Sequence, residues 1–325
     1  MRQRAHGADR MRTGAAAGYQ GYLHEAVYYR SAGELLAVAV PFLLGGVEAG
    51  EPTVVALGEE HAGLVREATG GDPRITYLAG GEMYARPASA IRAYRSLLVD
   101  HVAAGAGQIR IIGELAAPAF GPTWDWWARY ESAINHAYDD FPLWSMCAYD
   151  ANRTPPHVLR DVARTHPSVA EPGGRRRSPS YTDPTTFLLE PRPQPDDPVQ
   201  RTRPVAELID PLPAAARQAV RGADPGTLPA GALDNLVIAV SEVVTNAIRH
   251  GQAPVLMRLW TGADRMVVTV SDRGPGPKDP FAGLLPRTDG EPGGLGLWLT
   301  HQLCDFVTVD RRDTGFTIRL VAGGL

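Results

Sequence analysis

Lysine is almost absent from this chain of 325 residues, because Lys278 is the only one and arginine carries the remaining basic charge. A phosphate loop of the GxxxxGK type ends in a lysine that follows a glycine, and Lys278 follows a proline, so no such loop occurs anywhere in the sequence. Cysteine is nearly as scarce. Cys147 and Cys304 are far apart, which excludes a disulfide framework and a metal cluster of several cysteines. A reducing cytoplasm fits this usage.

Strong net charge and long apolar runs are missing as well. The formal net charge is -4 and the isoelectric point is near 6.1, so no overall basic field favours nucleic acid or an anionic membrane as a direct partner. The longest apolar stretch, residues 35–47, is shorter than the roughly 20 residues of a membrane span and contains Pro41. Residues 1–20 are rich in arginine without the apolar core of a signal peptide, and they are predicted to be a disordered leader. We therefore expect a cytoplasmic protein that does not enter a membrane.

Residues 21–167 are predicted to form an α/β domain. Short apolar runs of β type alternate there with helical stretches, and the strands are expected at residues 26–29, 52–58, 74–80, 108–115 and 143–150. Such alternation is typical of repeated βα units on a mostly parallel sheet that is covered on both faces. Residues 168–204 are dense in proline, glycine and charge, and are predicted to be a semi-extended linker in which Arg175, Arg176 and Arg177 are solvated.

Residues 205–325 show a different pattern, in which strands neighbour strands and helices neighbour helices. Helices are expected at residues 213–222, around Glu242 and at 295–304, and strands at 254–260, 265–272, 305–312 and 316–322. This grouping predicts an α+β two-layer sandwich with helices on one face of a mixed sheet.

The helix "AVSEVVTNAIRHG" carries two polar residues, Glu242 and Asn246, that lie four positions apart and so share one face. Its apolar residues, which indicate burial, are Val240, Val243, Val244, Ala247 and Ile248. A buried carboxylate needs a partner or a metal ion. One amide oxygen suffices for Mg²⁺ that is also bound to phosphates, so Asn246 is a candidate ligand and Glu242 a candidate general base.

Two glycine-rich segments follow this helix. In "SDRGPGP", Asp272 ends a strand and can accept a hydrogen bond from an exocyclic amine, while Gly274 and Gly276 let a planar base approach the backbone. In "EPGGLGLWL", glycines lead into a helix N-terminus, where free N–H groups favour phosphate. These glycines are Gly293, Gly294 and Gly296.

The segment between the two glycine-rich stretches would be a lid over the phosphates. Arg287 in this lid is a candidate contact of the γ-phosphate, although a solvent-exposed arginine explains it equally well. Each of these motifs alone could have a purely structural role, as a polar pair on a helix surface, a turn or the start of a helix. Their occurrence together, in this order, is what indicates a nucleotide site.

These motifs resemble those of the GHKL superfamily of ATP-binding domains (HATPase_c, the Bergerat fold). "SEVVTNAIRHG" is similar to its N box, "DRGPG" to its first glycine box and "GGLGL" to its second. The amino-acid sequence of the N box most resembles that of the Rsb-type anti-sigma-factor kinases, the RsbA family. The resemblance implies ATP and Mg²⁺ as cofactors, Glu242 as catalytic base, Asn246 as magnesium ligand and Asp272 as the carboxylate that reads adenine. It also implies nucleotide-loop roles for the glycines, and it puts Thr317 where the family has a hydroxyl near the adenine.

The same resemblance implies a serine/threonine kinase that phosphorylates a STAS-type anti-sigma antagonist and sequesters a sigma factor. A histidine kinase would need a phosphoacceptor on an upstream helical hairpin, and no histidine lies between His166 and His250. His250 is interpreted as a capping residue at the end of the site helix, with Gly251 as terminator. A sensor histidine kinase-like protein, a non-catalytic ATP-gated anti-sigma module and an ATPase switch stay open as alternatives. The absence of a transducer segment after the domain argues against the switch, and a homodimeric assembly is also open.

The first domain, with "HEAVYYRSAGELL", "IRIIGEL" and "MCAYD", resembles the MEDS domain, a sensory module that actinobacteria couple to kinase domains of this type. The resemblance implies a RecA-like sheet whose phosphate loop has been lost, and a small-molecule ligand is open. A pocket would lie beyond the carboxyl ends of the strands. Candidates for it are His24, Tyr29, Glu114, Trp124, Glu131 and Cys147. Each has a packing interpretation too, and a metal site of His24, Cys147 and Glu114 is a hypothesis without supporting ligand spacing.

Overall fold

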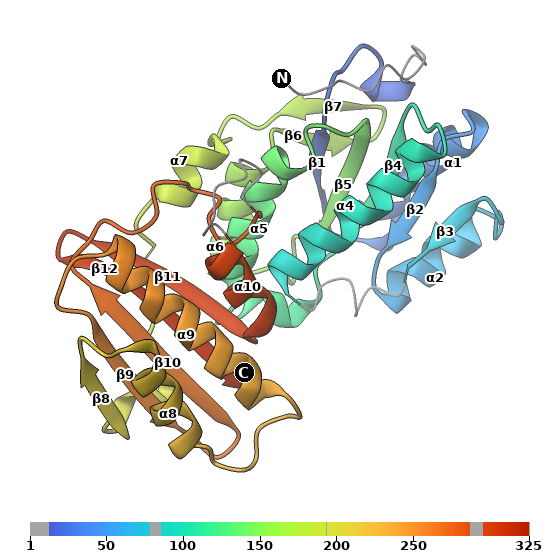
Figure 1. Cartoon of the computed structure of the whole chain (residues 1–325). Coiled ribbons are helices and arrows are strands. Elements are labelled where there is room, and N and C mark those ends of the chain that lie inside the picture. Colours follow the sequence, from blue (N-terminus) through green and yellow to red (C-terminus); the bar gives the residue numbers. More distant parts are fainter. Residues whose placement is uncertain (1–12, 79–85, 193, 287–294, 325) are drawn as a thin grey trace. The chain divides into compact units, whose positions relative to one another are not determined.

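A computed structural model describes residues 13–78, 86–192, 194–286 and 295–324 of the chain. The chain divides into two compact units, of which the second begins at Leu188 and also includes Arg86–Ala88. Each unit has its own apolar core and is described by itself (Figure 1). None of the helices in the described ranges has the length and apolar content of a membrane-spanning segment.

The first unit is built on a seven-stranded sheet with the order β3-β2-β4-β5-β1-β6-β7. Its strands are β1 (Leu23–Tyr29), β2 (Thr53–Ala56), β3 (Ile75–Tyr77), β4 (Ile109–Gly113), β5 (Leu143–Asp150), β6 (Ser168–Glu171) and β7 (Gly174–Arg177). Every neighbouring pair is parallel except β6 and β7. The predicted mostly parallel α/β sheet is confirmed.

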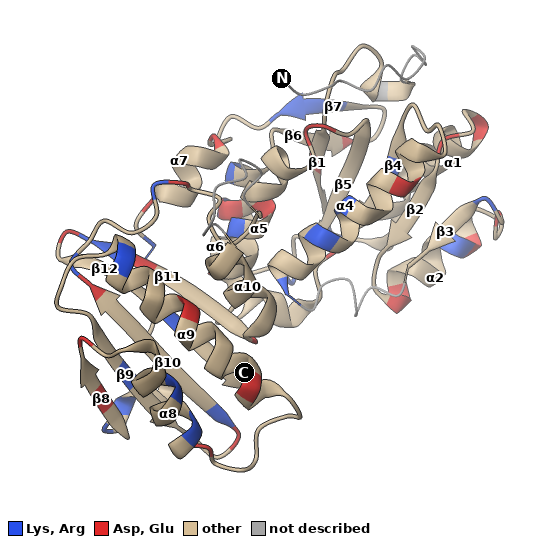
Figure 2. Ribbon diagram, in the orientation of Figure 1, with Lys and Arg blue, Asp and Glu red and all other residues tan. Residues whose placement is uncertain are grey.

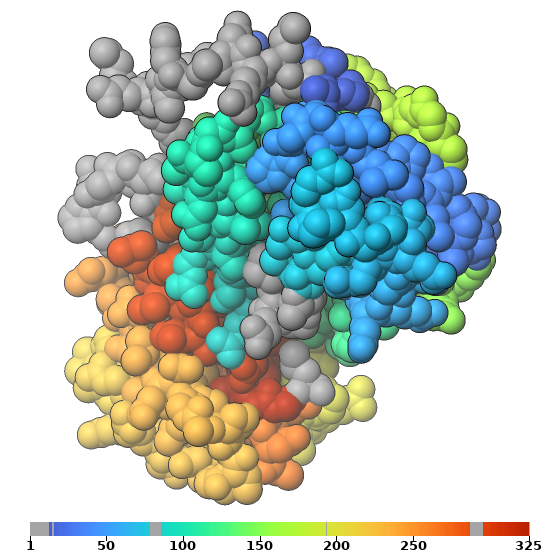
Figure 3. Space-filling model, turned by 90° about the vertical axis from the view of Figure 1, so that its right-hand side faces the viewer, coloured from blue at the N-terminus to red at the C-terminus, as the bar shows by residue number. Residues whose placement is uncertain are grey.

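Helices cover both faces of this sheet. The chain crosses toward β3 through α1 (Ala32–Glu48) and α2 (Glu59–Ala68) and returns through α4 (Pro87–Ala103), α5 (Trp124–Ala137) and α6 (Pro156–Thr165). Because βαβ crossovers are right-handed, reversing the direction of travel moves the helices to the opposite face. Figure 3 looks onto the β3 edge, with the blue side chains of α1 and α2 to one side and the teal side chains of α4 to the other.

The turn from β1 to α1 stands where a phosphate loop would lie in a nucleotide-binding sheet. Ser31 caps the helix by accepting a hydrogen bond from the Glu34 backbone N–H, and Glu34 Oε2 accepts one from the Arg30 N–H at 2.8 Å. A carboxylate thus occupies the helix N-terminus that would otherwise attract an anion. This capping agrees with the expectation that the first domain has lost its phosphate loop.

The leader and the linker are more ordered than the sequence indicates. In the leader, residues 13–20 include a 3-10 turn, η1 (Gly14–Ala16), and Arg110 Nη2 donates to Thr13 Oγ1 at 2.6 Å. In the linker, β6 pairs with β1, β7 pairs with β6, and the short helix α7 (Pro184–Leu189) buries Phe187. Strand pairing satisfies backbone groups without a long apolar run, which is why composition missed it. The predicted solvated run lies exposed on β7, drawn blue in Figure 2.

The second unit is a two-layer α+β sandwich, as predicted. Its sheet has the order β11-β12-β10-β9-β8, with β8 (Ala206–Ile209), β9 (Leu256–Thr261), β10 (Arg265–Asp272), β11 (Phe306–Arg312) and β12 (Gly315–Gly323). Helices α8 (Pro213–Gly222), α9 (Ala232–His250) and α10 (Leu295–Leu303) pack on one face (Figure 1). The predicted mixed sheet is wrong, because all four described pairings are antiparallel. Two of them, β9–β10 and β11–β12, are hairpins, which require antiparallel strands.

The opposite face of this sheet is partly covered by the end of the linker. Arg319 donates to the Pro195 carbonyl at 2.8 Å, and Trp260 Nε1 donates to the Thr202 carbonyl at 3.1 Å. Between these contacts lies the turn η3 (Pro198–Arg201), whose capping residue Asp197 forms an ion pair with Arg265 at 3.0 Å. This part of the linker therefore belongs to the second unit.

Candidate functional site

Helix α9 presents Glu242 and Asn246 at half-buried positions, while Val240 and Val244 on its other side are buried in the core. Ile248, expected to be buried, is 49 % exposed because it lies on the outer side of the last turn. Within the described residues, neither the Glu242 carboxylate nor the Asn246 amide takes part in a hydrogen bond or an ion pair. These polar atoms are therefore available to a ligand.

The start of α10 lies directly against this polar pair. A β-carbon added to Gly296, the second residue of α10, would be 2.6 Å from Glu242 Oε2 and 3.4 Å from Asn246 Nδ2. Real side chains do not approach that closely, so a larger residue at this position would displace the Glu242 carboxylate. The predicted N box and the end of the predicted second glycine box thus meet in space.

Asp272 lies at the end of β10 and ties the first glycine-rich loop to the end of α9. It is 8 % exposed, and its Oδ1 atom accepts hydrogen bonds from the Gly274 N–H at 2.6 Å and the Gln252 N–H at 3.1 Å. A β-carbon at Gly251 would lie 2.4 Å from Asp272 Cγ, so the chain can approach the carboxylate only through glycine. The Oδ2 atom accepts no hydrogen bond from the described part of the chain and stays available.

The loop that follows Asp272 packs against residues of β11 and β12. Gly276 has a positive φ of 73°, and a β-carbon there would be 2.4 Å from Phe316 Cδ2. Arg311 donates to the carbonyls of Pro275 and Pro277 at 3.0 Å each. Gly276 therefore serves close packing of the loop onto Phe316, in addition to any approach of a base.

Thr317 does not join this site, which corrects the sequence prediction. Thr317 pairs with Ser271 across β10 and β12, and their hydroxyls are 2.8 Å apart. Adjacent residues of a strand point to opposite faces, so Thr317 faces away from Asp272 and from the helices. Phe316, which pairs with Asp272, occupies the position on the site side. The sequence "FTIRL" already indicates this orientation, because apolar and polar residues alternate in it and Phe316, Ile318 and Leu320 share the apolar face.

Three predicted site residues, Arg287, Gly293 and Gly294, lie outside the described residues. The lid and the first part of the second glycine box therefore stay predictions.

In the first unit, the candidates separate into two groups. Glu114 accepts hydrogen bonds from the Gly58 N–H at 2.6 Å and contacts His61 Nδ1 at 2.9 Å, and the Tyr29 hydroxyl lies 3.4 Å from His61 Nε2. Trp124 is buried and donates from Nε1 to Asp161 Oδ2, so it packs α5 against α6. The hypothetical grouping of Glu114 with His24 and Cys147 is therefore wrong.

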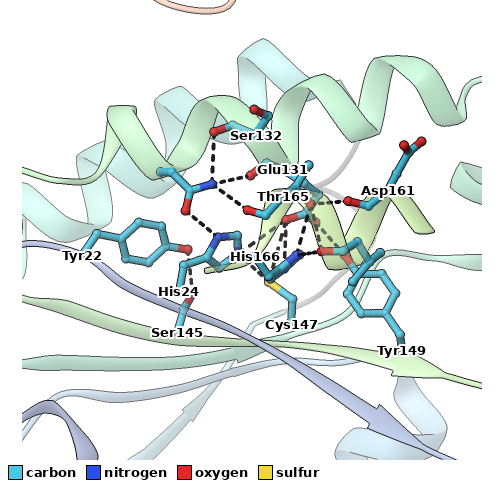
Figure 4. Close-up of polar contacts among 12 residues, drawn as sticks. Tyr22, His24, Glu131, Ser132, Ser145, Cys147, Tyr149, Asp161, Thr165 and His166 are labelled. Carbon is cyan, nitrogen blue, oxygen red and sulfur yellow. Dashed lines mark hydrogen bonds and ion pairs between the residues drawn. The ribbon is translucent and has the colours of Figure 1, made fainter. Parts of the chain in front are cut away.

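His24 and Cys147 do meet, across the neighbouring strands β1 and β5, with His24 Nε2 3.4 Å from Cys147 Sγ. Glu131 of α5 joins them, as does His166, which follows α6 (Figure 4). Sequence reasoning had placed Glu131 among the candidates but had missed His166. No ligand spacing links His166 to the others along the chain.

Comparison with known families assigns both units. Residues 23–167 match the model of the MEDS domain (MEthanogen/methylotroph, DcmR Sensory domain), and residues 206–322 match that of the histidine kinase-like ATPase domain. The chain carries a MEDS domain followed by a histidine kinase-like ATPase domain. No curated protein matches the sequence significantly.

The solved structures that resemble part of the chain are remote. They include the histidine kinase domain of a blue-light activated kinase from Erythrobacter litoralis (23 % identity, 35 % of this chain and 61 % of that chain, TM-score 0.24). The RsbU and RsbW domains of a Mycobacterium tuberculosis protein match at 21 % identity over 37 % of this chain and 31 % of that chain (TM-score 0.25). The histidine kinase domain of the E. coli osmosensor EnvZ matches at 18 % over 38 % and 91 % (TM-score 0.24). The chain thus spans less than two thirds of the first two of these proteins.

The side chains of the ATPase domain fit the nucleotide that this fold binds. The Asn246 amide can offer an oxygen ligand to Mg²⁺, a hard cation that needs few protein ligands when it is bound to phosphates. Asp272 Oδ2 can accept a hydrogen bond from an amine, and its other oxygen is held by the backbone. These donor and acceptor types suit a purine nucleotide with bound magnesium.

Proposed function

We propose that this chain is an Mg-ATP-dependent serine/threonine protein kinase that regulates a sigma factor. Its ATPase domain would phosphorylate a STAS-type anti-sigma antagonist and sequester the sigma factor, in the cytoplasm, under control of the MEDS domain. This proposal would place the chain in the RsbA family of anti-sigma regulators.

The observation that carries the proposal is the pair on α9. Glu242 and Asn246 share one helix face, are half-buried, and have no hydrogen-bonding partner among the described residues. A carboxylate held for structural reasons alone would be expected to find a partner at this depth, because burying an unpaired charge costs free energy. The start of α10 lies against this pair, since a β-carbon at Gly296 would be 2.6 Å from Glu242 Oε2.

Each side chain would then have a distinct role. Asn246 would hold Mg²⁺, which when bound neutralises charge on the phosphates. Asp272, fixed through Oδ1, would accept a hydrogen bond from the adenine amine. Glu242, one turn before Asn246, would orient an incoming hydroxyl and accept its proton. Positioning of this kind supplies most of the catalysis in phosphoryl transfer.

The secondary structure between His166 and His250 favours a hydroxyl over a histidine as the phosphate acceptor. In the described chain between His166 and the start of α9, the longest helix is α8, with ten residues. The other elements there are β6, β7, α7, η3 and β8, and none of them is longer than six residues. No long helical hairpin that could present a phosphoacceptor histidine occurs there. His250 itself is exposed at the end of α9 and is better placed to complement the helix dipole.

The proposal is tested by incubating the full chain with labelled ATP, Mg²⁺ and STAS-domain proteins from the same genome. Acid-stable phosphoserine or phosphothreonine on one of them is the expected product. Acid-labile label on the chain itself would overturn the serine/threonine assignment in favour of a histidine kinase. Unchanged ATP turnover without any protein acceptor would instead indicate an ATPase switch.

The role assignment needs two variants and a control. Glu242→Gln should lower transfer by at least about 10²-fold while ATP binding is retained, whereas Asn246→Ala should weaken Mg-ATP binding. Asn235→Ala removes an amide from the same helix eleven residues earlier and should change neither. Equal transfer by the wild type and Glu242→Gln would contradict the role of Glu242.

A further inference from the structure

Four side chains of the MEDS domain, three of them buried and one half-buried, point toward one another between the sheet and helices α5 and α6. They are His24 of β1, Glu131 of α5, Cys147 of β5 and His166 after α6. One ligand atom of each lies within 4.8 Å of those of the other three (Figure 4). His24, Glu131 and His166 are only 1 %, 2 % and 0 % exposed.

Four of the six distances among these atoms are close to the edges of a tetrahedron around a zinc ion. His24 Nε2 lies 3.4 Å from Cys147 Sγ and 3.6 Å from Glu131 Oε2. Glu131 Oε2 lies 3.6 Å from His166 Nε2 and 3.9 Å from Cys147 Sγ. Typical zinc bond lengths to nitrogen, sulfur and oxygen put neighbouring tetrahedral ligands about 3.4 to 3.6 Å apart. These four distances lie within a few tenths of an ångström of that geometry, and the other two, from His166 to His24 and to Cys147, are no longer than 4.8 Å.

The hydrogen bonds around the cluster orient both imidazoles for metal binding. His166 Nδ1 is 2.9 Å from the Val162 carbonyl, which can only accept, so Nδ1 carries the proton and Nε2 carries a lone pair. Asn135 donates from Nδ2 to three carbonyls, which leaves its Oδ1 atom to accept from His24 Nδ1 at 3.1 Å. His24 Nε2 thus also carries a lone pair. Such outer partners are the usual supports of metal-bound histidines.

The remaining carboxylate oxygen is supported in the same way. The Tyr149 hydroxyl donates to Glu131 Oε1 at 3.0 Å, and this directs Oε2 toward the two imidazoles. Within the described chain, His166 Nε2 has no hydrogen-bonding partner, although it is fully buried. At 3.6 Å, its contact with Glu131 is longer than a hydrogen bond. A metal ion between Glu131 Oε2 and His166 Nε2 would bind both atoms at once.

The charges of the four ligands suit a divalent ion. Metal binding would displace the protons of the Glu131 carboxyl and the Cys147 thiol, and a divalent cation would balance the carboxylate and the thiolate that result. The two imidazoles would bind as neutral ligands through Nε2.

We propose that His24, Glu131, Cys147 and His166 form a four-coordinate site for a divalent metal ion of the zinc class in the MEDS domain. Imidazole, thiolate and carboxylate together suit zinc better than magnesium or calcium. The four protein ligands leave no open position for a substrate, so the site is of the closed type. Its metal would fasten α5 and the end of α6 to the central strands β1 and β5.

The test uses the full-length protein and metal binding as its readout. After treatment with a chelator, the wild-type chain should bind one equivalent of Zn²⁺ or Co²⁺. Co²⁺ should give visible bands of a tetrahedral complex and a near-ultraviolet charge-transfer band from the thiolate. Absence of stoichiometric binding, or Co²⁺ spectra without thiolate character, would overturn the proposal.

Matched variants locate the site. Cys147→Ser should abolish the charge-transfer band, and His166→Gln should lower the affinity for Zn²⁺ by more than about 100-fold, because it removes a direct ligand. Cys304→Ser removes the other cysteine, and His61→Gln alters the other histidine–glutamate contact, the one with Glu114. Both controls should bind Zn²⁺ as the wild type does.

A loss of folding in the ligand variants would not obscure the result. Asn135→Ala keeps all four ligands but removes the hydrogen bond that orients His24, together with those from Nδ2 to three carbonyls. It should lower the affinity about 10- to 100-fold with the Co²⁺ spectrum retained. Circular dichroism of each variant would show whether the fold is intact. Equal affinity in the wild type, His166→Gln and Asn135→Ala would exclude the assigned ligands.

Discussion

Replacing Gly296 by alanine should separate the stability of the ATPase domain from its activity. A β-carbon at this position would lie 2.6 Å from Glu242 Oε2, so the carboxylate would have to move by about 0.8 Å to reach an ordinary contact of 3.4 Å. Alanine is a better helix former than glycine by about 0.5 to 1 kcal/mol, and Gly296 lies in the first turn of α10. The atom that yields is the end of a flexible side chain, so folding should be unaffected or slightly favoured.

Activity should respond in the opposite direction. Displacing a catalytic group by about 1 Å can lower the rate by about 10²-fold, and Glu242 is the proposed base. Asn246 Nδ2 would be 3.4 Å from the new β-carbon, an ordinary contact, so Mg-ATP binding should change by only a few fold. Phosphotransfer to the antagonist, binding of a fluorescent ATP analogue and the urea midpoint would be measured on the same preparation.

Gly222→Ala provides the control for this experiment. Gly222 ends α8 in the same domain, and a β-carbon there would meet nothing within 4 Å. It should leave both stability and transfer close to wild-type values. Wild-type transfer by Gly296→Ala would refute the placement of Glu242 beside the reacting hydroxyl, and a large loss of stability would refute the assumption that the side chain yields.

Three further predictions concern other parts of the chain. Asp272→Asn keeps the Oδ1 acceptor but turns Oδ2 into a donor, so ATP binding should fall at least about 10²-fold at nearly constant stability in urea. Arg110→Ala leaves Glu51 buried without its 2.6 Å partner and should lower the unfolding free energy of the MEDS domain by about 3 to 5 kcal/mol in urea titrations. Burial raises the pKa of the Cys304 thiol to about 12, whereas the pKa of the thiol in the unfolded chain is about 8.5. Between these two pH values the thiol is deprotonated only in the unfolded state. The free energy of unfolding therefore falls there by up to about 1.4 kcal/mol per pH unit. Cys304→Ala should lack this part of the alkaline loss in urea titrations at pH 8 and pH 10.

Each of these predictions has an outcome that contradicts it. Tight ATP binding by Asp272→Asn would exclude a hydrogen bond from the base to Oδ2. A change below about 1 kcal/mol in Arg110→Ala would mean that Glu51 finds water or another partner. Equal losses of stability between pH 8 and pH 10 in Cys304→Ala and the wild type would show that other groups, such as buried tyrosines, account for the whole slope.

Local patterns in the sequence were enough to predict most helices and strands of both domains. The βα alternation before residue 167 predicted a mostly parallel sheet, which the structure has. The pairing of β6 with β1 could not be predicted in this way. Its few apolar residues lie in a segment rich in proline and arginine, and its stability depends on a partner strand more than a hundred residues away.

The nucleotide motifs could likewise be predicted from the sequence, since Glu242, Asn246, Asp272 and the glycines lie in short segments with a recognisable order along the chain. The structure decided which of them face one another. It put Gly296 against Glu242, and it turned Thr317 to the other face of the sheet because β12 pairs with β10 in a register that aligns Thr317 with Ser271. Register is set by packing across strands, which no single segment contains.

The sequence by itself therefore determined the two domain types and the residue chemistry of the ATP site, because helical and strand periodicity and motif order are local properties. Only the tertiary structure decided the composition of the buried cluster in the MEDS domain. Glu114 lies with His61, whereas His166, which no spacing marked, completes the set with His24, Glu131 and Cys147. These four residues come from four separate elements, and only the packing of α5 and α6 on the sheet brings them within 4.8 Å of one another.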